Sequence, residues 1–174
     1  YSRSMDVVAA AAKTDRHELT RRWLTEPLGM SNSKWTVRGA PELQRINRFG
    51  FATTARDLAR FGLMMLARGR WNERAILTDQ AFFNEATTTS QPFNPHYGYL
   101  WWLNRNANAP DAGPRLKTAP IDMYAAQGAL NRRCFVVPSL QLVVTRLGDQ
   151  PEAGKQFDHE FWRRLSQAAP KSKS

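Results

Sequence analysis

Apolar residues recur every three or four positions in the first part of the chain, which predicts amphipathic helices. The first predicted helix covers residues 5–13 and follows Ser4, a typical capping residue. The second follows Asp15 and Glu18, which have the spacing of a capping box, and it ends at Pro27. The predicted apolar faces are Val7, Val8, Ala11 and Ala12 in the first helix and Leu19, Trp23 and Leu24 in the second.

The strongest helical pattern follows Thr54, which is placed to cap a helix together with Asp57. Gly69 is expected to end this helix. A shorter helix, capped by Thr78 or Asp79, follows in "ILTDQAFFNEAT". The predicted buried stripe of the longer helix is Leu58, Phe61, Met65 and Leu66.

Two stretches without a helical or alternating pattern, residues 31–52 and 104–120, are predicted to be loops. The aromatic run over residues 97–104 favours a strand. Three more strands are predicted further along, the last two joined by a tight turn around Pro138 and Ser139. Their sequences are "DMYAAQG", "RCFVVP" and "LQLVVTRLG".

The closing stretch "FDHEFWRRLSQAA" has the pattern of an amphipathic helix. Helices followed by antiparallel strands and a last helix predict an α+β fold, with a helix packed on an antiparallel sheet. We expect a single domain over residues 1–174, mostly helical with loops over 1–120 and built of sheet strands and the C-terminal helix over 121–174. The predicted inner side of that helix is Phe157, Phe161, Trp162 and Leu165.

Composition and charge argue against a disordered, membrane-spanning, nucleic-acid-binding or disulfide-bonded protein. Hydrophobic residues make up 42% and charged residues 23% of the 174 residues, which is typical of a globular protein rather than a disordered one. No apolar run approaches the roughly 20 residues that span a bilayer. The net charge of +10 comes mostly from scattered arginines without a nucleic-acid-binding motif, so nucleic acid is not a predicted partner. The single cysteine, Cys134, excludes an internal disulfide, and its apolar neighbours predict a buried side chain.

Several familiar catalytic and ligand-binding motifs are absent from the sequence. His17, His96 and His159 lack the spacing of metal ligands, so structural or surface roles are predicted for them. There is no GxSxG nucleophile elbow for a Ser-His-Asp triad. There is also no GxxxxGK or GxGxxG loop for phosphate.

Four stretches of the chain carry a family resemblance: "YSRS", "EPLGM", "TTARDLARFGLMMLARGRW" and "YAAQGALNRRCFVVPSLQLVVTRLGD". Their order and spacing resemble the serine β-lactamase and penicillin-recognising superfamily. More narrowly, the chain resembles the branch that contains class C β-lactamases, β-lactamase-like esterases and 6-aminohexanoate-dimer hydrolases. The resemblance covers essentially the whole chain. It implies a β-lactamase/transpeptidase-like fold, an antiparallel sheet flanked by helices, here lacking the N-terminal part.

Members of this superfamily use three motifs. In Ser-x-x-Lys the serine accepts the acyl group, a tyrosine then shuttles protons with the lysine, and Lys-Thr-Gly or a substitute supplies an oxyanion-hole N–H from a strand. By this resemblance Tyr1 is the proton shuttle. Ala126, Gln127 and Gly128 match the third motif, and the Ala129 N–H is a donor of the oxyanion hole.

Two stretches imitate these motifs. Ser31 and Lys34 fit Ser-x-x-Lys, but they lie after the tyrosine and in a predicted loop, whereas the motif needs a helix start that places both side chains on one face. Residues 117–119 imitate Lys-Thr-Gly, but Pro120 follows and a ladder strand is disfavoured there. Neither is predicted to be catalytic.

The resemblance implies a serine hydrolase that cleaves an ester or amide bond of a small molecule through an acyl-enzyme. It implies no metal or organic cofactor. Arg3 stands where lactamases carry asparagine, which favours an esterase or amidase. Gln127 and four aromatic residues are candidates to line the acyl pocket, although aromatic residues in one strand are more often core. These are Tyr97, Tyr99, Trp101 and Trp102.

The nucleophile of the family precedes its tyrosine, whereas this sequence begins at the tyrosine. We therefore expect the serine, the lysine and the first strands to lie in a preceding part of the same protein, which would be this chain's partner, and we expect the chain alone to be inactive. The resemblance favours a bacterial periplasmic or secreted location, and a cytoplasmic one stays open. The alternative function is a non-catalytic binding or envelope-associated protein with the same fold.

Overall fold

The computed structural model describes residues 2–105, 113–152, 154 and 156–168. The chain starts with helix α1 (Ser2–Ala11), helix α2 (Arg16–Thr20) and a π-helical turn (Arg21–Thr25). The carboxylate of Asp15 caps α2 as predicted, because it accepts hydrogen bonds from the backbone N–H groups of His17 and Glu18 at 2.7 and 3.0 Å.

Two details of these helices differ from the prediction. Ser4 lies inside α1 rather than at its cap. Trp23 is 58% exposed, although Leu19 on the same predicted face is buried. The π-helical turn explains this, because a wider turn moves Trp23 off the face that α-helical spacing assigns to it.

The prediction of a loop over residues 31–52 is wrong. Strand β1 (Lys34–Val37) pairs antiparallel with strand β2 (Phe49–Ala52), and helix α3 (Pro41–Asn47) lies between them. Each element is four to seven residues long. Such short stretches carry too little pattern to be separated from a loop.

The long helix α4 (Ala55–Leu66) agrees with the prediction. The Thr54 hydroxyl accepts a hydrogen bond from the Asp57 backbone N–H at 3.2 Å, and the chain turns at Gly69, where φ is +90°. A Cβ at Gly69 would lie 2.4 Å from the Leu77 carbonyl oxygen, so glycine is needed there. The short strands β3 (Arg70–Trp71) and β4 (Arg74–Ala75) follow, and helix α5 (Gln80–Ala86) is capped by Asp79.

The main sheet has four antiparallel strands in the order β5-β6-β7-β8. Three of them match the predicted strands. The predicted strand over residues 97–104 is reduced to β5 and an isolated bridge between Tyr97 and Trp102. The bounds are Trp102–Leu103 for β5, Tyr124–Gln127 for β6, Arg133–Val137 for β7 and Leu142–Arg146 for β8.

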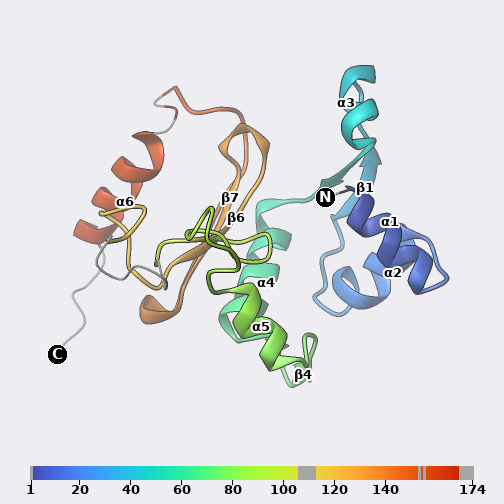
Figure 1. Cartoon of the computed structure of the whole chain (residues 1–174), viewed down its shortest axis with the longest axis horizontal. Helices are drawn as coiled ribbons and strands as arrows, with labels where there is room; N and C mark the ends of the chain where they lie inside the picture. The colour runs from blue at the N-terminus through green and yellow to red at the C-terminus, as the bar shows by residue number, and fades with distance from the viewer. Residues whose placement is uncertain (1, 106–112, 153, 155, 169–174) are drawn as a thin grey trace.

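The sheet lies between two helices, α4 and the C-terminal helix α6 (Gln156–Ala168) (Figure 1). Each helix helps to form a separate hydrophobic core. The core on the α4 side contains Leu28, Met65 and Val136, and the core on the α6 side contains Phe135 and Trp162. The α+β fold predicted from the order of the elements is therefore confirmed. Among the described residues, no helix is long and apolar enough to cross a membrane.

Cys134 is buried in the sheet, as predicted, with 1% of its surface exposed. Burial raises the pKa of its thiol to about 12, so very little thiolate forms near neutral pH. We expect iodoacetamide to leave Cys134 unmodified in the folded protein at pH 8 and to alkylate it fully in urea, as measured by mass spectrometry. Rapid alkylation of the folded protein would mean that β7 is open to solvent.

Candidate active site

The residues of the predicted third motif lie at the end of β6. Ala126 is half-buried against the core on the α4 side, and Gln127, the last residue of β6, is exposed. Gly128 then begins a turn that leads into β7. Two backbone hydrogen bonds close this turn: the Gly128 N–H donates to the Arg132 carbonyl at 2.9 Å, and the Arg132 N–H donates to the Ala129 carbonyl at 3.2 Å.

Ala129 is exposed on this turn. The described part of the structure contains no acceptor for its backbone N–H. Backbone N–H groups that are not tied up in secondary structure are the usual donors of an oxyanion hole. The Ala129 N–H is therefore free to donate to a bound group.

A hollow of about 500 Å³ lies beside this turn. Gln127, Gly128 and Ala129 form one side of it, while Arg115 and His159 come from other parts of the fold. Part of its lining is the buried ion pair between Arg133 in β7 and Asp158 in α6. The sequence-predicted motif thus opens onto a recess with polar and charged walls.

The Arg133–Asp158 ion pair joins the sheet to α6. Both Nε and Nη2 of Arg133 donate to Oδ2 of Asp158, at 3.2 and 3.0 Å, and the two side chains are only 6% and 8% exposed. Nη2 also donates to the side-chain oxygen of Asn131 in the turn. A buried ion pair of this kind fixes geometry, because either partner alone would be strongly disfavoured in the interior.

The structure separates the predicted aromatic residues. Trp101 is 7% exposed and packs between Phe61 and Tyr124, with ring centroids 5.9 and 5.1 Å away, so it belongs to the core and does not line the hollow. Tyr97 packs edge-on against Trp102 at 4.9 Å. Neither Tyr97 nor Trp102 is among the residues that line the hollow.

Trp102 packs against one residue that lines the hollow, Arg115. The guanidinium of Arg115 lies 4.7 Å from the centre of the Trp102 ring, and Arg115 itself lines the hollow. Sequence reasoning missed Arg115, and a single arginine in a loop carries no local signal that could have revealed it.

Tyr99 is not among the residues that line the hollow, and it donates its hydroxyl proton to Glu85 at 3.3 Å on the surface near α5.

The predicted catalytic tyrosine, Tyr1, lies outside the described residues. Helix α1 begins at the next residue, Ser2. The described residues therefore contribute the strand and turn of the candidate site.

Ser31 and Lys34, which match Ser-x-x-Lys in sequence, are not arranged as that motif requires. Ser31 lies in a turn and Lys34 begins β1, so the two do not share a helix face. Ser31 Oγ accepts a hydrogen bond from the Asn32 side chain at 3.2 Å. The second imitation, residues 117–119, is also in a turn, where the Thr118 hydroxyl donates to the His159 carbonyl at 3.0 Å.

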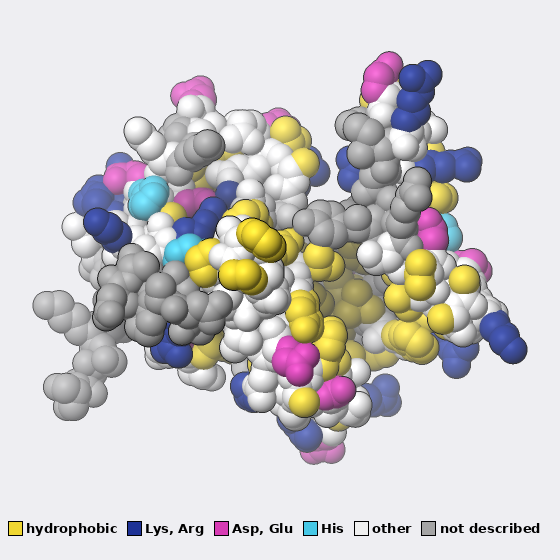
Figure 2. All heavy atoms as spheres, in the orientation of Figure 1, with side chains coloured by type: hydrophobic (Ala, Val, Ile, Leu, Met, Phe, Trp, Pro, Cys, Tyr) yellow, Lys and Arg dark blue, Asp and Glu magenta, His cyan; other side chains and the backbone are white. Residues whose placement is uncertain are grey.

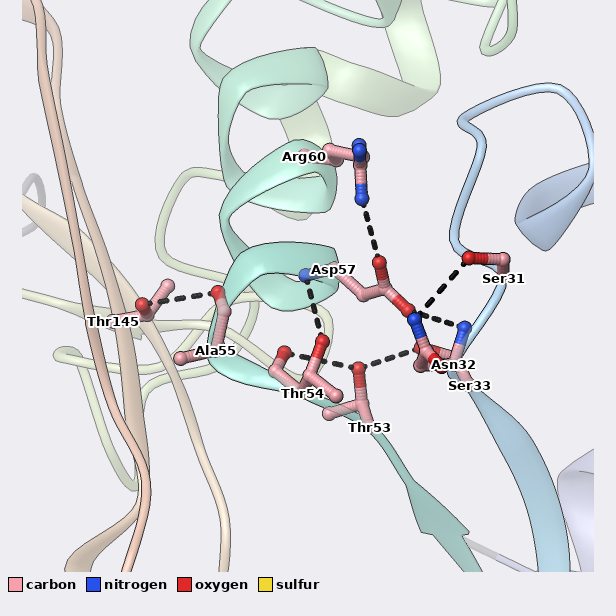
Figure 3. Close-up of polar contacts among 9 residues, drawn as sticks. All are labelled: Ser31, Asn32, Ser33, Thr53, Thr54, Ala55, Asp57, Arg60 and Thr145. Carbon is pink, nitrogen blue, oxygen red and sulfur yellow. Dashed lines mark hydrogen bonds and ion pairs between the residues drawn. The ribbon is translucent and has the colours of Figure 1, made fainter.

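Asp57 holds the turn that contains Ser31 (Figure 3). Its carboxylate is completely buried and accepts hydrogen bonds from the Asn32 backbone N–H at 2.8 Å and the Ser33 hydroxyl at 2.9 Å. Arg60, one helical turn further along α4, donates to its other oxygen at 2.7 Å. The cluster links α4 to the segment before β1, which is a structural role.

Within the described residues, no group of three His, Cys, Asp or Glu side chains is arranged to hold a metal ion. The three histidines lie in α2, in the loop before β5 and in α6. His17 and His159 are exposed and His96 is half-buried, and His159 is one of the residues that line the hollow.

The comparisons with known proteins come from a family model and from solved structures. The model of the Beta-lactamase family matches residues 5–169. A β-lactamase from Mycobacterium bovis is similar with a TM-score of 0.63 at 18% identity, over 94% of this chain and 58% of that one. A putative β-lactamase from Bacteroides dorei gives a TM-score of 0.60 at 16% identity, over 84% of this chain and 48% of that one. The chain therefore spans about half the length of these structures, and no curated protein matches it.

Proposed function

The chain belongs to the β-lactamase family, and from this premise we propose that the whole protein is a serine hydrolase that cleaves an ester or amide bond through an acyl-enzyme. The observation that carries the proposal is the free Ala129 N–H at the end of β6, beside a hollow large enough for a small acyl group. In this proposal the Ala129 N–H donates to the oxyanion of the tetrahedral intermediate.

The nucleophile in this proposal is the serine of a Ser-x-x-Lys motif that precedes Tyr1. A serine hydroxyl is a weak nucleophile until a neighbouring group removes its proton. A lysine ammonium close to the Tyr1 phenol lowers the phenol's pKa and makes that exchange feasible near neutral pH. Tyr1 returns the proton to the leaving group, so that one phenol serves both steps.

The proposed substrate is a small ester or amide rather than a lactam, because Arg3 occupies the position at which lactamases carry asparagine. Gln127 and Gly128 would lie along the acyl group, and Ala126 would support the strand from the core side. Tyr97 and Trp101 act behind this surface, as packing residues. The proposal needs no metal or organic cofactor.

We also propose that the segment preceding Tyr1 covers apolar surface of this chain. Figure 2 shows hydrophobic side chains in the hollowed region between the sheet and the group formed by α1, α2 and β1. In α1, Val7 and Val8 are exposed although they belong to its apolar face. Strand β8 is also an edge of the sheet, and edge strands are commonly paired or covered.

A fluorophosphonate probe tests the proposed function, because it labels an activated serine covalently. We expect the whole protein to be labelled at a serine that precedes Tyr1, and the 174 residues alone to remain unlabelled. Ser31→Ala is the control and should leave the labelling of the whole protein unchanged. Labelling at Ser31 would contradict the proposal, and a whole protein that is neither labelled nor active on p-nitrophenyl esters would favour a binding protein with this fold.

A further inference from the structure

The turn that carries Ala129 has an unusual backbone. Leu130 and Asn131 have φ values of +56° and +59°, so two consecutive residues other than glycine adopt the left-handed conformation. This conformation is uncommon for residues with a side chain, because Cβ crowds the neighbouring carbonyl. The turn keeps its shape only if contacts from outside it hold these two residues in place.

Arg146, the last residue of β8, supplies such contacts. Its Nη1 donates to the carbonyl oxygens of Leu130 and Asn131, both at 3.2 Å. Its Nη2 donates to the Asp149 carbonyl at 2.6 Å, and its guanidinium carbon lies 4.9 Å from the centre of the Phe157 ring. One guanidinium thus binds both left-handed residues and is itself held by the segment that follows β8 and by Phe157 of α6.

Arg133 also contacts the turn, but it has a second role. Its guanidinium holds the Asn131 side chain and forms the buried ion pair with Asp158, so its loss would leave Asp158 unpaired in the interior. Arg146 differs because it bonds neutral carbonyl groups near the surface, which water can reach if the side chain is removed. Replacing Arg146 is therefore expected to loosen the turn without unfolding the protein.

We propose that Arg146 is a positioning residue that holds the 128–132 turn so that the Ala129 N–H points at the oxyanion. The inference rests on the proposed function. The oxyanion develops in the transition state, so a misdirected N–H lowers kcat and leaves substrate binding nearly unchanged. A residue that only stabilised the fold would change the melting temperature and not the kcat of the folded enzyme.

The first test compares Arg146→Met and Arg146→Lys in the whole protein, with p-nitrophenyl esters as substrates. For Arg146→Met we expect kcat to fall by about tenfold to a hundredfold, since small displacements of catalytic groups have effects of this size, and KM to stay within about twofold. Arg146→Lys should recover part of the loss, because an ammonium can still donate to both carbonyl oxygens. Arg164→Met removes an exposed arginine of α6 that, among the described residues, bonds Glu160 alone, and it should leave kcat unchanged.

The second test measures hydrogen exchange in the same whole proteins and does not depend on activity. The Gly128 and Arg132 N–H groups close the turn, so in Arg146→Met they should exchange about tenfold faster, which corresponds to a turn that opens more often. They should exchange at the wild-type rate in Arg164→Met. Unchanged exchange in Arg146→Met would overturn the proposal even if kcat fell, because Arg146 would then act other than through the turn.

The two tests separate this inference from the proposed function. A wild-type protein that fluorophosphonate does not label disproves the hydrolase, whereas exchange still shows whether Arg146 holds the turn. A labelled and active wild type with normal kcat in Arg146→Met disproves the positioning role alone.

Discussion

Replacing Tyr1 with phenylalanine in the whole protein is expected to lower kcat about a hundredfold or more, because general acid–base catalysis typically contributes 10²–10⁴-fold. The substitution removes one hydroxyl group and keeps the aromatic ring, so packing is preserved. KM should change little, since the phenol transfers a proton in the transition state and does not contribute to binding the substrate in the ground state. The measurement is steady-state hydrolysis of a p-nitrophenyl ester, with the concentration of folded enzyme checked by circular dichroism.

Tyr99→Phe is the matched control for this prediction. It removes the hydroxyl group that bonds Glu85 on the surface near α5, and Tyr99 is not among the residues that line the hollow, so kcat should be unchanged. An unchanged kcat in Tyr1→Phe would reduce Tyr1 to a packing residue. It would also remove the proton shuttle from the proposed mechanism while leaving the family assignment untouched.

The parts of the fold that the sequence predicted correctly have strong local signals. Helix α4 combines a capping threonine at 54, a regular apolar stripe and a glycine at 69 that only a left-handed turn requires. Strands β7 and β8 are apolar runs on either side of a proline turn. In each case the cap, the pattern and the turn residues favour the same structure, which is why these predictions held.

The errors arise where distant residues determine the structure. The β1–β2 pairing joins Lys34 to Ala52 across a short helix, and no local pattern reports a pairing of this kind. Alpha-helical spacing places Trp23 on the buried face, but the π-helical turn does not keep that spacing. On sequence alone Trp101 fits either a pocket or the core, and its packing between Phe61 of α4 and Tyr124 of β6 decides for the core.

The candidate site was predictable only in part. The strand end at Gly128 was identified through the family resemblance, and the structure adds that the following N–H is free. Arg115 comes from a loop, Arg133 from β7 and Asp158 from α6, so their meeting in one hollow depends on the tertiary fold. The support that Arg146 gives to the turn depends equally on the pairing of β7 with β8.

Replacing Asp57 with alanine is expected to lower the free energy of unfolding by about 3 kcal/mol, because it removes a completely buried acceptor that serves three hydrogen-bond donors. The carboxylate is completely buried and satisfies the Asn32 N–H and the Ser33 hydroxyl as well as Arg60. Alanine removes this acceptor from all three donors, although the Ser33 hydroxyl keeps its bond to Thr53 at 2.7 Å and the partly exposed Arg60 guanidinium can bond water. The loss is a large part of the 5–15 kcal/mol by which domains are typically stable, and urea unfolding followed by tryptophan fluorescence measures it.

Two further variants separate the contributions to this cluster. Arg60→Met should destabilise by only about 1 kcal/mol, because the guanidinium is one-third exposed and Asp57 keeps its two other donors. Asp57→Asn keeps the shape of the side chain but replaces one acceptor oxygen with a donor, so its effect should lie between the other two. If Asp57→Ala and Arg60→Met destabilised equally, the ion pair alone would account for the role of Asp57. The hydrogen bonds from Asn32 and Ser33 to Asp57, which join the segment before β1 to α4, would then contribute little to stability (Figure 3).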